Sequence, residues 1–490
     1  MFTSIIAGLA AGGLLDSREK VGLVSLPSSV PKAAAAKTSG RRVSRRAIAA
    51  WLTFDWAAQP HFTLVTTFVF APYFASRLAA TPAEGQALWG YATGFAGLLI
   101  AMLSPVLGAI ADAAGARKPW IEVFSILLVT GGASLWFAAP GSGTGIAIAL
   151  VGFAVATLAA EFATVFTNAM MPELVEEESL GRLSGTGWAV GYAGGLVSLV
   201  LVLGFLVANP GTGLTLFAAP PLFGLDPATF EGDRASGPFA ALWYAVFVLP
   251  LFLFVPDRPK RARLGEAVRA GTRKLVATLS SAGAHRNVVR FLLAHMIYAD
   301  GLVALFAFGG IYAAGTFGWT SFELGLFGIL LTVTGTFGAL TGGWLEDRCS
   351  AKTIVGWALA LLILASIGIL SVDAGHIGFV IDVAPAMPDD GLFASAGERV
   401  YLALGAVIGA LAGPLQASSR SLMARIAPLG RATEFFGLYA LSGKVTSFMG
   451  PLAVAAVTAL SQSQRLGIAV LVVFFALGGV LLIGVKAVRE

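Results

Sequence analysis

The sequence contains a single cysteine and has few of the residue patterns that metals or catalysis require. Cys349 has no partner in the chain, which excludes an intramolecular disulfide. The four histidines, His61, His285, His295 and His376, are scattered without ligand spacing, so we predict no metal site. The sequence shows no nucleophile paired with a base and no carboxylates at catalytic spacing. We therefore predict neither enzymatic activity nor a cofactor.

Charged residues are also scarce, at 12% of the 490 residues, whereas 57% are hydrophobic and the mean hydropathy is +0.82. A soluble fold could not hide this much apolar surface from water, so the lipid bilayer must be the solvent. The sequence pI of about 9.4 could suggest a nucleic-acid partner. The basic residues, however, lie between apolar runs, so we predict no nucleic acid and interpret them as a topology signal.

Twelve apolar runs are long enough to cross a hydrocarbon core, which takes roughly 20 residues per helix. They predict an all-α integral membrane protein with twelve transmembrane helices in two six-helix repeats. The first six runs fall near 47–76, 86–111, 119–139, 144–171, 184–208 and 239–256. The second six fall near 290–315, 322–345, 353–372, 399–424, 433–459 and 465–486.

These runs divide the chain into four parts. Residues 1–46 read as a disordered cytoplasmic tail and not as a signal peptide. Residues 47–256 form the N-terminal six-helix bundle and 290–490 the C-terminal one. The basic stretch 257–289 is expected to link the two bundles along the cytoplasmic membrane surface.

The distribution of Lys and Arg sets the predicted orientation. Of 32 such residues, only Arg77, Arg234, Arg399 and Arg465 fall on the side opposite both termini, apart from one within a span. The connection 373–398 is acidic and belongs with that sparse side. By the positive-inside rule, both termini face the cytoplasm and 373–398 faces outward. We expect a multi-pass protein of the cell (inner) membrane, acting as a monomer.

The two halves repeat a loop motif after their second span. GAIADAAGARK after span 2 and GWLEDRCSAK after span 8 place a Gly and an Asp four residues apart, followed by a basic residue. Repeated halves are the usual plan of secondary transporters. The corresponding residues are Gly108, Asp112 and Lys118 in the first half and Gly343, Asp347 and Lys352 in the second.

The first of these loops resembles the cytoplasmic loop motif of the major facilitator superfamily. Gly108, Asp112, Gly115, Arg117 and Lys118 match it, whereas Ala113 and Ala116 replace two usual basic positions. The resemblance implies the major facilitator fold and a conformational gate. In this gate Asp112 with Arg117 would close the cytoplasmic side by bonding across the halves, mirrored by Asp347 with Arg348 and flanked by Gly343 and Lys352.

Longer stretches of both halves resemble the vacuole-effluxer-like family within that superfamily. They include WLTFDWAAQPHFTLVTTFVFAPYFA in span 1 and FLLAHMIYADGLVALFAFGGIYAAG in span 7, with TNAMMPELVEEESLGRLSGTGWAVGYAGG across spans 4 to 5. A fourth, GPLQASSRSLMARIAPLGRATEFFGLYALSGKVTSFMGPL, covers spans 10 to 11. Family members implicated in vacuolar efflux export amino acids, so the resemblance implies amino acids as a candidate substrate class.

Four charged residues fall inside predicted spans: Asp55, Glu161, Asp300 and Lys444. Each costs about 2.5 to 3.5 kcal/mol at a helix centre on insertion scales, so each needs a partner or a function. Burial favours the protonated form of a carboxylate, which a proton-coupled step requires, so Asp300 and Glu161 are the candidates for protonation. The alternative is that Asp55 or Asp300 only pairs with Lys444 and holds helices together.

Uncharged polar and aromatic residues within the spans complete the candidate binding site. Amides and a histidine could bond a substrate, although amides also join helices as ordinary packing. Aromatic residues could line a pocket or belong to the interfacial belt. The candidates are Gln59, His61, Asn168, Gln416, Trp188, Tyr192 and Tyr298.

These features predict a secondary active transporter that moves a small polar solute by alternating access, coupled to protons. Two alternatives stay open at this stage. The chain could be a nutrient sensor that keeps the transporter fold, or a facilitator of sugars or other organic solutes without proton coupling. The repeated halves and the loop motif favour alternating access over a channel.

Overall fold

The computed structural model describes residues 44–114, 116–175, 180–257, 285–346, 348–387, 390–427, 438–439, 442–443 and 445–487. Most of the predicted tail and nearly all of the predicted basic linker lie outside these ranges. Val43–Glu490 clusters as a single compact unit, so the predicted division into two bundles stays a prediction. We use "N-terminal half" for 44–257 and "C-terminal half" for 285–487.

The N-terminal half is helical almost throughout. Its longer helices are α2 (Arg45–Pro60), α4 (Pro82–Ala114), α5 (Lys118–Ser134), α6 (Gly145–Ala169), α8 (Leu180–Phe205) and α9 (Glu231–Phe247). Its shorter helices are α3 (Phe70–Tyr73), α7 (Met171–Leu174) and α10 (Leu249–Phe254). Ser44 starts α2 by accepting a hydrogen bond from the main-chain N–H of Ala47.

The C-terminal half contains α12 (Arg286–Phe317), α13 (Ser321–Glu346), α14 (Ala351–Leu370), α15 (Ala396–Ile426), α17 (Met449–Ser461) and α18 (Gln464–Ile483). Serine side chains cap the first turns of three of these helices. Ser395 and Glu398 form a reciprocal capping box on α15. Each such cap stabilises its helix by about 1 kcal/mol.

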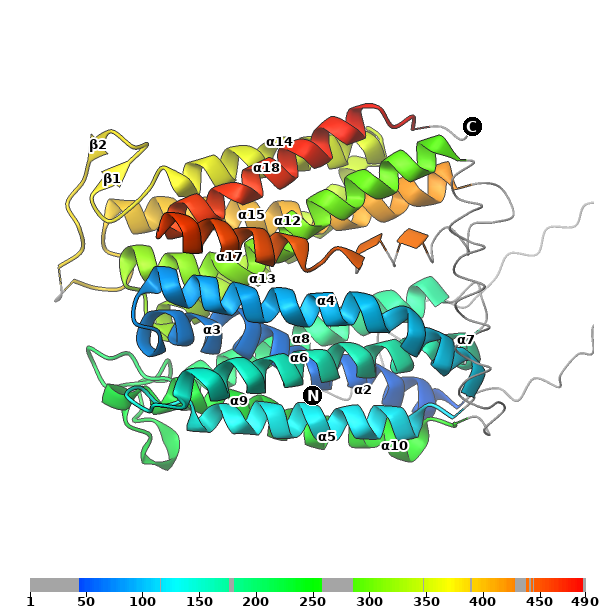
Figure 1. The fold of residues 1–490 in the computed structure, drawn as a ribbon, viewed down its shortest axis with the longest axis horizontal. Helices are drawn as coiled ribbons and strands as arrows, with labels where there is room; N and C mark the ends of the chain where they lie inside the picture. The colour runs from blue at the N-terminus through cyan, green and yellow to red at the C-terminus, as the bar shows by residue number, and fades with distance from the viewer. Residues whose placement is uncertain are drawn as a thin grey trace, which may run out of the picture. The chain divides into compact units, whose positions relative to one another are not determined.

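A short antiparallel hairpin follows α14, with β1 (His376–Ile377) paired to β2 (Ile381–Asp382). Figure 1 shows this hairpin at one end of the long helices, in yellow. We call this the hairpin end. The opposite end, where α5 and α14 begin with Lys118 and Lys352 in their first turns, we call the basic end.

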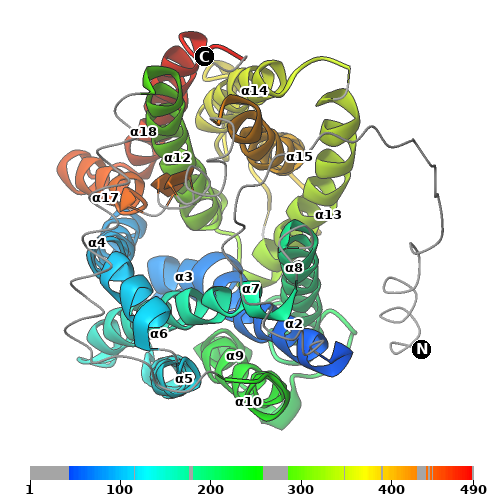
Figure 2. The same ribbon diagram turned by 90° about the vertical axis from the view of Figure 1, so that its right-hand side faces the viewer.

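The two halves meet along two seams, visible in the end-on view of Figure 2. Helix α4 packs against α17 at one seam, and α8 packs against α13 at the other. Glycine allows the close approach at Gly94, where a Cβ atom would overlap the side chain of Leu452. Small residues of this kind let membrane helices pack closely without a hydrophobic driving force.

The first predicted span is not one regular helix. After α2, residues His61–Phe68 form a π-helical segment, α3 follows, and Phe74–Leu78 is again π-helical. Pro60 and Pro72 each lack the N–H that a regular helix would use, which favours this break. The broken segment contacts α12 and α13 of the other half, so the irregular backbone lies within protein.

Equivalent contacts in both halves support the predicted repeat. At the basic end, Lys118 Nζ donates to the Phe252 carbonyl at 2.7 Å, and Lys352 Nζ donates to the Val485 carbonyl at 2.6 Å. In each half the third long helix is thus tied to the C-terminal end of the last. At the hairpin end, an arginine near the start of the last long helix of each half bonds a residue just after the third long helix. Arg234 donates to the Trp136 carbonyl, and Arg465 donates to the Asp373 carboxylate.

Within the described ranges, ten helices are long and apolar enough to cross a membrane. The predicted first span is the broken α2–α3 segment, and the described part of the eleventh is the 13-residue α17. The sixth span begins earlier than predicted, at Glu231 instead of residue 239. Its first turn carries charges that the sequence pattern places in a loop but that find partners in the fold.

Candidate functional site

Asp55 and Gln59 lie one turn apart on α2 and face the glycine-rich side of α8. A Cβ atom at Gly187 would overlap Asp55 Oδ2, and one at Gly191 would lie 3.4 Å from Asp55 Cβ and 3.6 Å from Gln59 Oε1. Side chains at these glycines would therefore fill the space that the carboxylate and amide occupy. The glycines of α8 give room for two polar groups inside the N-terminal half.

The aromatic candidates on α8 directly follow Gly187 and Gly191 in sequence. Trp188 and Tyr192 are 52% and 48% exposed, with ring centroids 5.7 Å apart. They are not core residues of the N-terminal half. Because half of each ring is uncovered, they can offer an apolar surface to a solute or to lipid.

The three other N-terminal candidates are His61, Glu161 and Asn168. His61 is buried, places Nε2 3.0 Å from Thr157 Oγ1 and stacks on the ring of Phe153. Its ring is thus held by neighbours on α6. Glu161 is half-buried on the same helix and has an interaction partner, whereas Asn168 near its end is exposed.

Asp300 is the most deeply buried of the predicted carboxylates, with only 1% of its surface exposed near the middle of α12. Among the residues that the structure describes, its Oδ1 atom has no hydrogen-bond partner. A Cβ at Gly450 would lie 2.5 Å from the Asp300 main-chain oxygen, so α12 and α17 pack very closely here. Lys444, the predicted partner, lies outside the described residues.

Tyr298 and His295, on the same helix, belong to a buried polar chain. The Tyr298 hydroxyl lies 2.6 Å from Ser419 Oγ, and His295 Nδ1 lies 3.0 Å from Ser442 Oγ. The two rings contact edge to face with centroids 5.4 Å apart. The chain links α12 to α15 and to the segment before α17. Gln416, also on α15, is exposed and does not join it.

In the N-terminal gate motif, Arg117 is buried and forms an ion pair with Glu173 of α7. The Asp257 carboxylate accepts hydrogen bonds from the main-chain N–H groups of Arg117 at 2.9 Å and Lys118 at 3.1 Å. A carboxylate at the N-terminus of α5 is favoured by the unpaired N–H groups there. Glu173, which follows α6 in the chain, thus bonds the basic motif.

Both of these partners of Arg117 belong to its own half. Closure across the halves by Asp112 with Arg117 therefore stays a prediction. Gly108 and Asp112 are placed on α4 by the backbone alone, and Gly115 and Asp347 lie outside the described residues.

In the second half, Gly343 lies on α13 and Arg348 is exposed and has an interaction partner. The buried acid next to the motif is Glu346, which accepts a hydrogen bond from Ser418 Oγ at 2.6 Å and pairs with Arg425 at 3.2 Å. Sequence reasoning missed Glu346, although its place beside Asp347 in the repeated motif is a usable signal.

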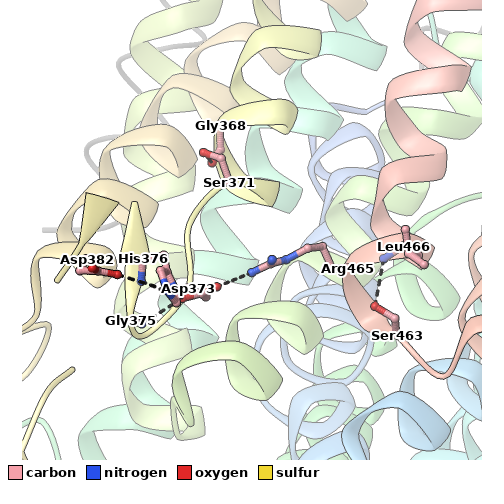
Figure 3. Close-up of polar contacts among 9 residues, drawn as sticks. All are labelled: Gly368, Ser371, Asp373, Gly375, His376, Asp382, Ser463, Arg465 and Leu466. Carbon is pink, nitrogen blue, oxygen red and sulfur yellow. Dashed lines mark hydrogen bonds and ion pairs between the residues drawn. The ribbon is translucent and has the colours of Figure 1, made fainter. Parts of the chain in front are cut away.

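A polar cluster at the hairpin end, drawn in Figure 3, fixes the loop after α14. Arg465 donates to Asp373 Oδ2 at 2.6 Å, and the His376 ring lies 3.0 Å from Asp373 Oδ1 and 3.4 Å from Asp382. Burial tends to raise the pKa of Asp373, but hydrogen bonds from Arg465, Gly375 and His376 outweigh it and hold that pKa well below its usual range. The carboxylate thus keeps its pair with Arg465 in mildly acidic surroundings.

Sequence reasoning also missed the first turn of α9, which was read as part of a loop. Asp233 and Arg234 are both buried there, and Asp233 accepts a hydrogen bond from Ser321 of the other half. No local sequence pattern identifies the Asp233–Ser321 pair, because the two residues are far apart in sequence.

The candidate residues therefore form separate groups. Asp55 and Gln59 lie together in the N-terminal half, and Asp300 with Tyr298 lies in the C-terminal half. This is the arrangement expected where a solute binds between two helical halves. The gate motif lies at the basic end, and the Asp233–Ser321 pair joins the halves near the hairpin end.

The chain is similar to known membrane transporters over nearly its whole length. The model of the family described as vacuole effluxer Atg22 like matches residues 86–490. An uncharacterized MFS-type transporter of Bacillus subtilis, YxiO, is 24% identical over 88% of this chain and 93% of its own. Autophagy-related protein 22-1 of Penicillium rubens is 25% identical over 56% of this chain, which spans only 44% of that protein.

Solved structures show the same fold at low identity. A bacterial homologue of the human lysosomal transporter Spinster, in an inward-facing and unoccupied conformation, aligns with TM-score 0.61 at 15% identity and covers 89% of this chain and 95% of its own. A D-xylose-proton symporter aligns with TM-score 0.62 at 12% identity, covering 91% and 99%. These relatives are transporters and not enzymes. The chain belongs to the vacuole effluxer Atg22-like family, an integral, multi-pass membrane protein with the major facilitator fold.

Proposed function

We propose that this protein is a proton-coupled secondary transporter that moves a small polar solute, with amino acids as the candidate class, by alternating access. The observation that carries the proposal is Asp300, a carboxylate that is 1% exposed and whose Oδ1 has no hydrogen-bond partner within the described ranges. An ionised carboxylate buried in this way is costly, and taking up a proton removes that cost. Proton uptake and release by Asp300 would connect solute movement to a proton gradient.

The contacts between the halves support alternating access. The hydrogen bonds from Ser321 to Asp233, from Gln86 to Thr458 and from Gln464 to Pro82 all lie toward the hairpin end. If the hairpin end faces outward, this arrangement is the closed outer side of an inward-facing state. Major facilitator halves rock about a central site, so the opposite closure completes the cycle.

The amino-acid proposal rests on family resemblance, and the proton proposal also has a structural neighbour named as a proton symporter. A neighbour named as a nucleoside transporter shows that the fold also serves other solutes. A facilitator of sugars or other organic solutes without proton coupling is therefore the second candidate. A transporter-fold sensor is the third.

Uptake into vesicles separates these functions. The full chain is reconstituted, a proton gradient is imposed, and accumulation of radiolabelled amino acids is compared with that of D-xylose. We expect amino acids to concentrate only while the gradient lasts. Equilibration of xylose without any effect of the gradient would instead support a facilitator, and absence of movement together with ligand-induced stabilisation would support a sensor.

We further propose that both termini and the basic end face the cytoplasm and that the hairpin end faces outward in the cell membrane, as the Lys and Arg distribution predicts. Asp390→Cys in a Cys349→Ser background is expected to react with a membrane-impermeant maleimide in intact cells. Native Cys349, which is exposed at the basic end, is the matched control. It should react only after the membrane is permeabilised, and the reverse pattern would invert the topology.

A further inference from the structure

The hairpin end carries a buried carboxylate that the proposed transport step does not use. Asp233 lies in the first turn of α9 and Ser321 in the first turn of α13, so the two residues come from different halves. They are 9% and 5% exposed. The Ser321 hydroxyl donates to Asp233 Oδ1 and lies 3.3 Å from the Val69 carbonyl, in the broken first span. One hydroxyl thus contacts two elements of the opposite half.

The N-terminal half holds Asp233 firmly in place. Its main-chain oxygen accepts a hydrogen bond from Ser236 Oγ at 2.6 Å. The neighbouring Arg234 donates to the Trp136 carbonyl at 3.1 Å, and its guanidinium lies 4.9 Å from the centre of the Trp136 ring. The two Arg234 contacts fix the first turn of α9 to the 3₁₀ turn Leu135–Phe137 that follows α5. The carboxylate is therefore presented to the other half from a rigid support.

The surroundings place this contact at the boundary between the two halves. A small hollow at the hairpin end is lined by both halves, including Tyr73, Arg77, Asp233 and Ser321. The Arg77 guanidinium lies 5.0 Å from the centre of the Phe230 ring, at the same hollow. Opening this end would move α13 away from α9 and break the bond.

A second polar contact lies at the other seam. Gln86 of α4 donates to Thr458 Oγ1 of α17 at 2.8 Å, and Gln464 donates to the Pro82 carbonyl at 3.0 Å. These bonds join neutral groups. Hydrogen bonds to a charged group are roughly twice as strong as neutral ones, so the Asp233–Ser321 contact is the stronger closure when its carboxylate is ionised.

We propose that Asp233 and Ser321 form a latch that holds the hairpin end closed and so sets the balance between the two states of the transport cycle. The inference rests on alternating access under the proposed function, but its test needs no substrate and no gradient. Removing the latch should raise the fraction of molecules open at the hairpin end.

The test uses a buried reporter residue at the seam where α8 packs against α13. Leu203 is fully buried, and a Cβ atom at Gly325 of α13 would overlap its side chain. Leu203→Cys in a Cys349→Ser background is reacted with maleimide in the purified full chain in detergent. Ser321→Ala should raise the labelling rate roughly tenfold or more, because the donor is gone. Asp233→Asn, which keeps an acceptor oxygen, should raise it several-fold.

The double variant separates a latch from two independent effects. Once Ser321→Ala has removed the donor, Asp233→Asn should add nothing further to the labelling rate. Ser321→Thr retains a hydroxyl and should stay near the background rate. The matched control is Ser125→Ala, which removes a buried 2.8 Å hydroxyl contact to Tyr244 within one half and should leave labelling unchanged.

Two results would overturn the proposal. One is a Ser321→Ala variant that labels no faster than the Leu203→Cys, Cys349→Ser protein. The other is an Asp233→Asn substitution that speeds labelling equally whether or not Ser321→Ala is also present. If Ser321→Ala does not fold, Asp233→Asn and Ser321→Thr decide the question alone, since the first must speed labelling and the second must not. Failure of proton-driven uptake would leave these rates untouched, so the two proposals can fail separately.

Discussion

Asp300→Asn is expected to abolish gradient-driven accumulation of solute in reconstituted vesicles while sparing the exchange of internal for external solute. Asparagine mimics the protonated carboxyl in shape but cannot release a proton. Exchange needs only rocking between two loaded states, whereas accumulation needs the proton to bind on one side and leave on the other. The expected effect is thus a complete loss of one activity and retention of the other.

The physical reason lies in the surroundings of this carboxyl group. It is 1% exposed, and its Oδ1 lacks a partner within the described part of the chain. A charged group at the centre of a membrane helix costs about 2.5 to 3.5 kcal/mol on insertion scales. A change in packing around α12 that admits water would stabilise the ionised form and release the proton.

Glu84→Gln is the matched control, because it makes the same acid-to-amide change on an exposed side chain in the first turn of α4. It should accumulate solute like the wild type. Wild-type accumulation by Asp300→Asn would show that the carboxylate is structural. Loss of both accumulation and exchange would show that Asp300 holds the fold or the solute, and not the proton.

Gly338→Ala is expected to lower the melting temperature by many degrees or to prevent folding. Gly338 lies on α13 against α15, and a Cβ atom there would overlap the main-chain carbonyl of Ala410. Backbone cannot rotate away as a side chain can, so α13 and α15 would have to separate. Overpacking of a tight interface costs about 1 to 3 kcal/mol and occasionally more.

Gly356→Ala on α14 provides the comparison, because a Cβ atom there meets nothing within 4 Å. This change should be neutral or stabilise the protein by about 0.5 to 1 kcal/mol, since alanine is the better helix former. Thermal unfolding of both purified variants in the same detergent measures the difference. Equal melting temperatures would mean that α13 and α15 do not pack as closely as described.

The positions of most spans could be predicted from the sequence because the bilayer requires long apolar runs. The second to fifth and the seventh to tenth predicted runs correspond to α4, α5, α6, α8, α12, α13, α14 and α15, with ends shifted by a few residues. The sixth differs most, because Asp233 and Arg234 look like loop residues until Ser321 and Trp136 are placed beside them.

The candidate site could be predicted only in part. Asp300 stands out in sequence because a carboxylate within an apolar run is costly, and the structure places it in the interior. His61 has the same kind of signal, yet Thr157 and Phe153 hold it inside the N-terminal half. A sequence shows that a polar residue lies in a span, but not which neighbours its helix faces.

Composition and pattern by themselves determined that this is a helical membrane protein with repeated halves, because hydrophobic length, small residues and motif spacing are local properties of the chain. The structure alone decided which distant groups meet. Arg117 pairs with Glu173, Ser321 reaches Asp233, and the first span breaks into π-helical segments between the halves. These contacts depend on the rotation and relative height of packed helices, which side-chain packing across the whole bundle sets.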